Sequence, residues 1–122
     1  MTQVPIEVSN FFLALQAGPH GLASLAEMFA QDAVYFEPFS GRSEPHKGRE
    51  AIAAAFDASR SGAFDDAVIS LQGSEIDDEK ISVRWTCVSK SIPGGRGSGT
   101  NVFKLKAGLI VSLVTTLDGD GA

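Results

Sequence analysis

The sequence has very little cysteine and histidine: one cysteine, Cys87, and two histidines among 122 residues. A lone cysteine cannot form an internal disulfide, which agrees with a reducing cytoplasm. So few sulfur and imidazole groups make a zinc site of protein ligands unexpected. No apolar run reaches the roughly 18 residues of a membrane-spanning helix, and the N-terminus lacks the basic and apolar regions of a signal peptide. We therefore expect one cytoplasmic domain over residues 1–122, without a metal or a membrane partner.

Acidic side chains are missing from one long stretch of the chain. Residues 80–117 hold six basic residues and no acidic one, although the whole chain has 15 acidic and 10 basic residues. The six basic residues are separated from one another, without the basic run or motif that is typical of a nucleic-acid-binding surface. We interpret them as the solvated side of a sheet and expect no nucleic-acid partner.

Hydrophobic spacing divides the chain into a helical first half and a strand-rich second half, the pattern of an α+β fold. Apolar residues follow helical spacing over residues 8–15 and 22–29, and again from residue 49 to residue 59. Alternation and turn residues predict strands over residues 33–37, 67–76, 80–91, 99–106 and 109–117. Residues 38–48 are predicted as a loop. The last four strands are joined by short turns, so we expect a mostly antiparallel sheet.

The most informative residue is Glu37, a carboxylate inside the aromatic run Val34-Tyr35-Phe36-Glu37-Pro38-Phe39. An ionised carboxylate in such surroundings loses hydration, and it must find a partner, reach water or raise its pKa. The last outcome would make Glu37 a general base near neutral pH. The alternative is an acid at a strand end that faces solvent. Tyr35 is expected on the opposite face from Glu37.

Alternation along the later strands places one polar residue, Asn101, among apolar neighbours. Asn101 shares a face with Phe103, and in the preceding strand Trp85 shares the apolar face with Cys87. A buried amide needs hydrogen-bond partners, so Asn101 is either a core residue bonded to its neighbours or a donor that faces a ligand. The indole N–H of Trp85 also needs an acceptor, for which Glu37, Asn101 and a ligand are the candidates. We interpret Cys87 as a small buried apolar residue.

The order of these elements resembles the nuclear transport factor 2-like superfamily, in particular its ketosteroid isomerase and SnoaL-like polyketide cyclase branch. Three segments carry the resemblance: residues 28–34 (MFAQDAV), 37–41 (EPFSG) and 47–52 (KGREAI). The resemblance implies a cone-shaped fold with three N-terminal helices packed on a curved, mostly antiparallel sheet. It also implies a homodimer through the outer sheet face.

The resemblance also assigns candidate site residues. The aspartate base of ketosteroid isomerase falls on Glu37, and its protonated aspartic acid falls on Asn101, whose amide can also donate a hydrogen bond to an oxyanion. The tyrosine on the first helix of the family falls near Phe11, which has no hydroxyl, so one oxyanion donor is missing. Dehydratase relatives use a histidine–aspartate pair. In this chain His20 lies in a turn and His46 in the predicted loop, and we expect His46 to be a loop or rim residue.

The leading hypothesis is an enzyme without a cofactor that transfers a proton next to the carbonyl group of a small apolar compound, giving isomerisation or cyclisation. Glu37 and Asn101 would be the catalytic residues. The substrate-binding pocket would be shaped by aromatic residues: Phe11, Trp85, Phe103 and Phe56. A non-catalytic binding or dimerisation module is the second hypothesis, and a hydrolase or dehydratase that uses bound water is the third.

Overall fold

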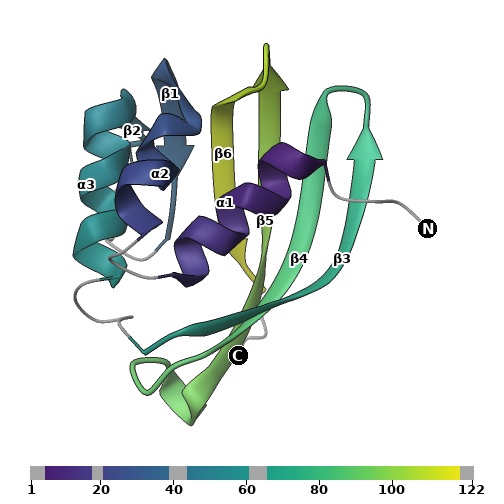
Figure 1. Ribbon diagram of the computed structural model, residues 1–122. Coiled ribbons are helices and arrows are strands. Elements are labelled where there is room, and N and C mark those ends of the chain that lie inside the picture. The colour runs from purple at the N-terminus through teal and green to yellow at the C-terminus, as the bar shows by residue number, and fades with distance from the viewer. Residues whose placement is uncertain (1–4, 18–20, 39–43, 61–65, 119–122) are drawn as a thin grey trace.

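The computed structural model of the protein describes residues 5–17, 21–38, 44–60 and 66–118 (Figure 1). In chain order its elements are α1 (Ile6–Gln16), α2 (Leu22–Glu27), β1 (Phe29–Phe36), β2 (His46–Lys47), α3 (Arg49–Arg60), β3 (Val68–Asp77), β4 (Lys80–Val88), the 3₁₀ turn η2 (Pro93–Gly95), β5 (Arg96–Lys106) and β6 (Leu109–Leu117). Within these ranges, no helix combines the length and the apolar content that a membrane crossing requires.

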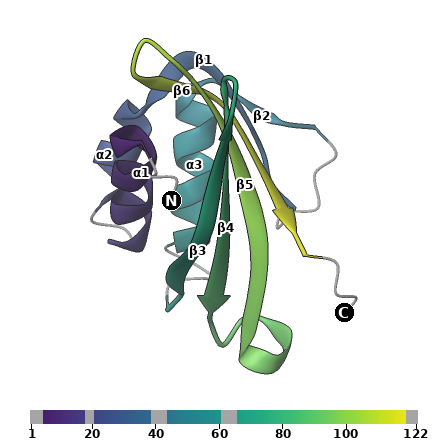
Figure 2. The same cartoon turned by 90° about the vertical axis from the view of Figure 1, so that its right-hand side faces the viewer.

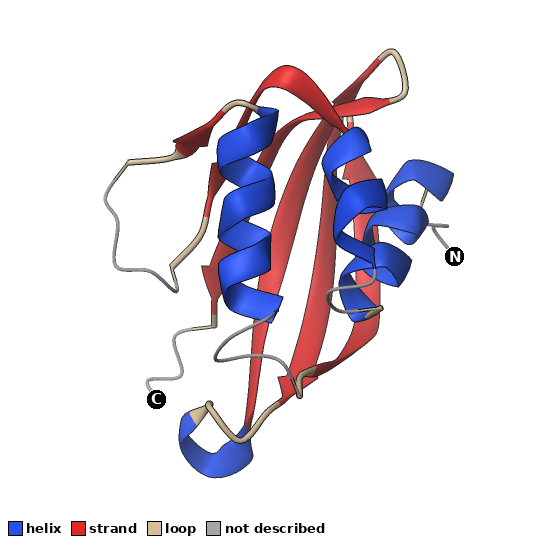
Figure 3. Cartoon of the chain, turned by 60° about the vertical axis from the view of Figure 1, so that its left-hand side comes forward, coloured by secondary structure: helices blue, strands red, loops and turns tan. Residues whose placement is uncertain are grey.

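The six strands form one mixed sheet in the order β2-β1-β6-β5-β4-β3. β1 runs parallel to β6, whereas the other neighbouring strands are antiparallel. The helices cover one face of the sheet, which curves around them (Figures 2 and 3). The α+β class and the mostly antiparallel sheet are thus confirmed. Three N-terminal helices are not confirmed in that form, because α1 and α2 precede the first strand and α3 follows β2.

The strand predictions succeed in the second half of the chain and fail in part in the first. β6 has the predicted bounds, and β4 begins at the predicted residue. Phe29, predicted within the second helix, is instead the first residue of β1, because it pairs with Ile110 of the parallel strand β6. The predicted loop of residues 38–48 contains β2. His20 and Phe39 lie outside the described residues.

Alternation along β4 is confirmed. The side chains on its inner face are buried: Ile81, Val83, Trp85 and Cys87. Arg84 on the outer face is exposed, as is Lys104 on β5. The basic residues of these two strands therefore lie on the solvent side, as predicted, and Cys87 is a buried free cysteine.

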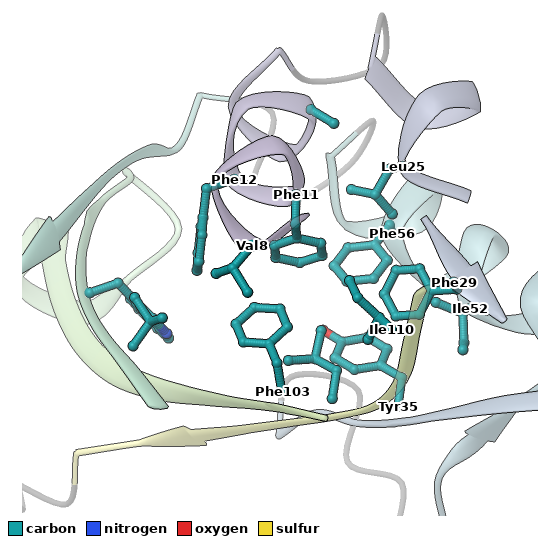
Figure 4. Packing of buried hydrophobic residues seen from close by; sticks show 14 of the residues in the cluster. Val8, Phe11, Phe12, Leu25, Phe29, Tyr35, Ile52, Phe56, Phe103 and Ile110 are labelled. Atoms are coloured by element: carbon teal, nitrogen blue, oxygen red, sulfur yellow. The ribbon is translucent and has the colours of Figure 1, made fainter. Parts of the chain in front are cut away.

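The core lies between the helices and the inner face of the sheet, and aromatic rings form its centre (Figure 4). Phe11 of α1 has no exposed surface. Its ring meets four others edge to face, at centroid distances between 5.1 and 6.1 Å: Phe12, Phe29, Phe56 and Phe103. Such pairs contribute about 0.5–1.5 kcal/mol each beyond the area that they bury. They connect α1 and α3 to strands β1 and β5.

Candidate functional site

Glu37 lies one residue beyond the end of β1, and its side chain is turned into the protein. The side chain is 6 % exposed, and its Oε2 atom lies 2.8 Å from Nε2 of His46. Of the three outcomes open to a carboxylate in aromatic surroundings, Glu37 has found a partner. The prediction that His46 is a loop residue is wrong, because His46 belongs to β2 and pairs with Tyr35 of β1. A strand of two residues has no alternation from which it could be predicted.

Tyr35 is buried on the same inner face as Glu37, and the prediction of the opposite face is wrong. Residues two apart in a strand share a face, so alternation itself contained the signal for this position. The ring of Tyr35 stacks on Phe56 at 4.7 Å and on His46 at 5.7 Å. Burial raises the pKa of the Tyr35 hydroxyl far above its usual range. The negative charge of Glu37 raises this pKa further, while a hydrogen bond with Thr115 acts in the opposite direction.

Asn101 of β5 is 5 % exposed. Its amide oxygen accepts two hydrogen bonds, from Trp85 Nε1 at 3.0 Å and from Thr115 Oγ1 at 2.8 Å. Because an indole N–H can only donate, the oxygen of the amide must face Trp85 and the NH₂ group must point away from it. In the part of the chain that the structure describes, no group accepts a hydrogen bond from this NH₂. The amide oxygen is thus bonded to its neighbours in the core, as the first alternative for Asn101 predicted. The NH₂ group can still donate a hydrogen bond, as the second alternative requires.

Glu37 and Asn101 lie on the same side of the sheet, with one strand between them. The register of β1 and β6 pairs Phe36 with Val114. The ladder ends at Phe36; continued by one residue, it would bring Glu37 level with Thr115, which β5 pairs with Asn101. Neighbouring strands are about 4.8 Å apart, so the backbones of Glu37 and Asn101 are separated by about 10 Å. A small organic molecule spans such a separation.

Trp85 lies over Gly99, its partner across the β4–β5 ladder. A methyl group on Gly99 would overlap the indole ring of Trp85 and the backbone carbonyl oxygen of Thr116. Gly99 therefore provides the space in which the indole can reach Asn101. Among the three acceptors considered for the indole N–H, the structure shows Asn101.

The four aromatic residues predicted to bind substrate all belong to the buried core. Phe11 and Phe103 have no exposed surface, and their rings pack edge to face at 5.2 Å (Figure 4). Phe56 is joined to the site through its stacking on Tyr35, and Trp85 through its hydrogen bond to Asn101. Contact of these four residues with a substrate stays a prediction.

Metal-binding side chains do not gather anywhere in the described residues. No group of three or more histidine, cysteine, aspartate or glutamate side chains is placed there to hold an ion. Glu37 and His46 together supply two such groups, fewer than the three or four protein ligands of a zinc site.

Comparisons with known proteins agree on the type of domain. The sequence profile of the SnoaL-like domain matches residues 8–113. A protein from Sinorhizobium meliloti, assigned provisionally as a polyketide cyclase, has a similar structure with a TM-score of 0.80 and 27 % identity, over 93 % of this chain and 95 % of that one.

Two further structures are similar at 16 % identity, and a likeness at this level shows the fold alone. A provisional ketosteroid isomerase from Kribbella flavida has a TM-score of 0.76 at 16 % identity, over 93 % of this chain and 76 % of that one. An NTF2-like protein from Anabaena variabilis has a TM-score of 0.77 at 16 % identity, over 99 % and 96 % of the two chains. No curated protein matches the chain.

The buried hydroxyl of Tyr35 should resist ionisation. Tyr35 is the one tyrosine of the sequence, so the ultraviolet absorbance of phenolate reports on it alone. An unfolded tyrosine is half ionised near pH 10, whereas folded Tyr35 should stay neutral there. Because the pKa is raised in the folded state, the stability that Tyr35 contributes is complete below about pH 10 and is lost as the pH rises. Phenolate should therefore form together with loss of far-ultraviolet circular dichroism.

A titration in urea is the control for this measurement and should show an ordinary phenol. Phenolate formation near pH 10 in protein with unchanged circular dichroism would contradict the buried position of Tyr35.

Gly99→Ala should displace the indole of Trp85 and weaken its hydrogen bond to Asn101. Overpacking of this kind costs about 1–3 kcal/mol of the free energy of unfolding, and the emission of the single tryptophan should change. Gly97→Ala on the same strand is the matched control, because a methyl group there would meet Ile92 at ordinary distances of 3.5 and 3.8 Å. Urea unfolding followed by fluorescence compares the two variants. Equal unfolding midpoints would show that Trp85 does not need the space at Gly99.

Proposed function

This chain belongs to the SnoaL-like domain family, and from that premise we propose that it is a small-molecule enzyme that transfers a proton next to a carbonyl group. The substrate would be a small apolar carbonyl compound, held in a pocket of a cone-shaped domain between the helices and the inner sheet face. The provisional names of two similar structures, polyketide cyclase and ketosteroid isomerase, support this type of chemistry. In this proposal the reaction uses no cofactor.

Glu37 is the proposed base. It would remove a proton from the carbon next to the carbonyl group and leave an enolate. The protonated acid would then return the proton to another carbon, which is isomerisation. Alternatively, the enolate carbon would close a ring by aldol addition to a second carbonyl group of the substrate, and the alkoxide formed would take the proton back from the acid. The burial of the Glu37 side chain supports this role, because bulk water would otherwise compete with the substrate for the carboxylate.

The observation that carries the proposal is the buried NH₂ group of Asn101, for which the described residues offer no acceptor. A buried donor without a partner costs about 1–3 kcal/mol, and a substrate oxygen would remove this cost. The bonds from Trp85 and Thr115 polarise the amide, which makes the NH₂ group a better donor. Since an enolate oxygen is more negative than a ketone oxygen, this bond would strengthen as the proton leaves.

Phe11 stands where the resemblance places a tyrosine, and Tyr35 does not replace that tyrosine directly. The hydroxyl of Tyr35 is engaged with Thr115, which in turn donates to Asn101. In the proposed site Asn101 is therefore the direct donor, and Tyr35 acts on it through Thr115. One donor instead of two typically lowers the rate by about 10²–10³.

Hydrogen–deuterium exchange tests the proton transfer without knowledge of the natural substrate. A polycyclic ketone is incubated with the protein in D₂O, and the loss of hydrogen next to its carbonyl group is followed by NMR. Glu37→Gln should reduce the enzymatic rate by about 10²–10⁴, and Asn101→Leu by about 10²–10³. The matched control is Glu50→Gln, an exposed carboxylate in the first turn of α3, which should exchange like the wild type. Undiminished exchange by Glu37→Gln would exclude the mechanism.

The packing around Phe11 favours a second candidate, a binding or dimerisation module without chemistry. Four rings surround that of Phe11, so side chains fill the core at this point. In this case binding of the ketone would change the fluorescence emission of Trp85, and the wild-type protein would not accelerate the exchange of hydrogen for deuterium in the ketone.

A hydrolase or dehydratase that uses bound water is the third candidate. The contact between Glu37 and His46 favours it, since a carboxylate can orient an imidazole as a base.

We also propose a homodimer through the outer sheet face. Three apolar side chains are exposed there: Phe36 at 39 %, Val68 at 55 % and Val88 at 55 %. Val102→Glu would place a charge in the middle of this face and should shift sedimentation from dimer to monomer. Leu13→Glu is the control, because Leu13 is 70 % exposed on α1, away from the sheet. Sedimentation of the wild type as a monomer would contradict the dimer.

A further inference from the structure

His46 meets Glu37 through one defined contact. Nε2 of the ring lies 2.8 Å from Oε2 of the carboxylate, and the two side chains are 12 % and 6 % exposed. An ionised carboxylate only accepts hydrogen bonds, so Nε2 must carry a hydrogen atom when Glu37 is charged. The second ring nitrogen, Nδ1, then decides whether the imidazole is neutral or positive.

His46 is held in place from several sides. Its ring stacks on Tyr35, which stacks in turn on Phe56. Its backbone pairs with β1, and the N–H of Gly48 donates to the carbonyl oxygen of Ala33 at 2.8 Å. Gly48 has a φ of +92°, a conformation that glycine adopts at little cost, and it leads directly into α3. A side chain held by stacking and strand pairing can keep a neighbouring group in the narrow geometry that catalysis needs.

From this geometry we propose that His46 is a positioning residue for Glu37, an inference that rests on the proposed role of Glu37 as the base. A neutral imidazole with its hydrogen on Nε2 orients the carboxylate through Oε2 and leaves the negative charge in place.

The other charged groups of this region either bond elsewhere or are exposed. Its titratable neighbours on β1 and directly after this strand are Tyr35 and Glu37. Arg49, at the start of α3, donates to the carbonyl oxygen of Phe29 at 2.9 and 2.6 Å. The remaining charged residues with described side chains next to His46 and on α3 are exposed: Glu44, Lys47, Glu50 and Asp57.

NMR of the imidazole tests the contact without an assay of activity. In protein with nitrogen-15-labelled histidine, the His46 signals are identified by their loss in His46→Gln. The wild type should show a slowly exchanging Nε2–H that disappears in Glu37→Leu and persists in Glu50→Leu, the control. A wild type without this protected hydrogen would overturn the proposal.

The kinetics of deuterium exchange into the polycyclic ketone test the role. His46→Gln keeps an N–H donor at this position, so it should stay within about tenfold of the wild-type rate. His46→Leu removes the donor and should lower kcat by about 10- to 100-fold with little change in KM, as is common for residues that orient a functional group.

The results distinguish a failure of the proposed role of His46 from a failure of the proposed function. Exchange by His46→Gln within about tenfold of the wild-type rate, together with a kcat about 10- to 100-fold lower at little-changed KM in His46→Leu, would support the role. If both His46 variants keep the kcat and KM of the wild type while Glu37→Gln is inactive, His46 is merely structural and the proposed function stands. If Glu37→Gln exchanges at the wild-type rate, or the wild type does not accelerate exchange, the proposed function itself fails.

Discussion

The amide oxygen of Asn101 accepts hydrogen bonds from Trp85 on β4 and Thr115 on β6, and this single acceptor links three neighbouring strands. Both donors are buried, and either would cost about 1–3 kcal/mol if it lost its partner. The two bonds also set the direction of the amide, because its NH₂ group must then face away from Trp85. The same arrangement depends on Gly99, since a larger residue would take the space of the indole. The inner face of the sheet thus has a polar centre in apolar surroundings.

A second buried polar group, the carboxylate of Glu37, is stabilised in another way. Its partner is His46, which a very short strand places opposite Tyr35. Tyr35 connects the two polar groups, because its ring stacks on His46 and its hydroxyl bonds to Thr115. Acid and amide therefore belong to one continuous set of contacts across β2, β1, β6 and β5. A change at one end of this set is expected to reach the other.

Alternation predicted the second half of the sheet well, since successive side chains of a strand point to opposite faces and the turns between these strands are short. It placed Trp85 and Asn101 on the inner face. It also contained the correct position of Tyr35, two residues before Glu37, although the prediction put Tyr35 on the wrong side. The start of β1 at Phe29 was not predictable from local spacing, because a parallel partner from the far end of the chain converts the last residue of a helical pattern into a strand residue.

The sequence by itself determined the class of fold, the faces of the later strands and the presence of one acid and one amide in apolar surroundings. The periodicity of hydrophobic residues indicates on which face of a helix or strand a side chain lies, and this periodicity depends only on residues close in sequence. The tertiary structure alone decided that Glu37 is bonded to His46 and that Asn101 accepts from Trp85 and Thr115. Those partners come from separate strands, and which strands become neighbours, and in what register, depends on how the whole sheet is assembled around its helices.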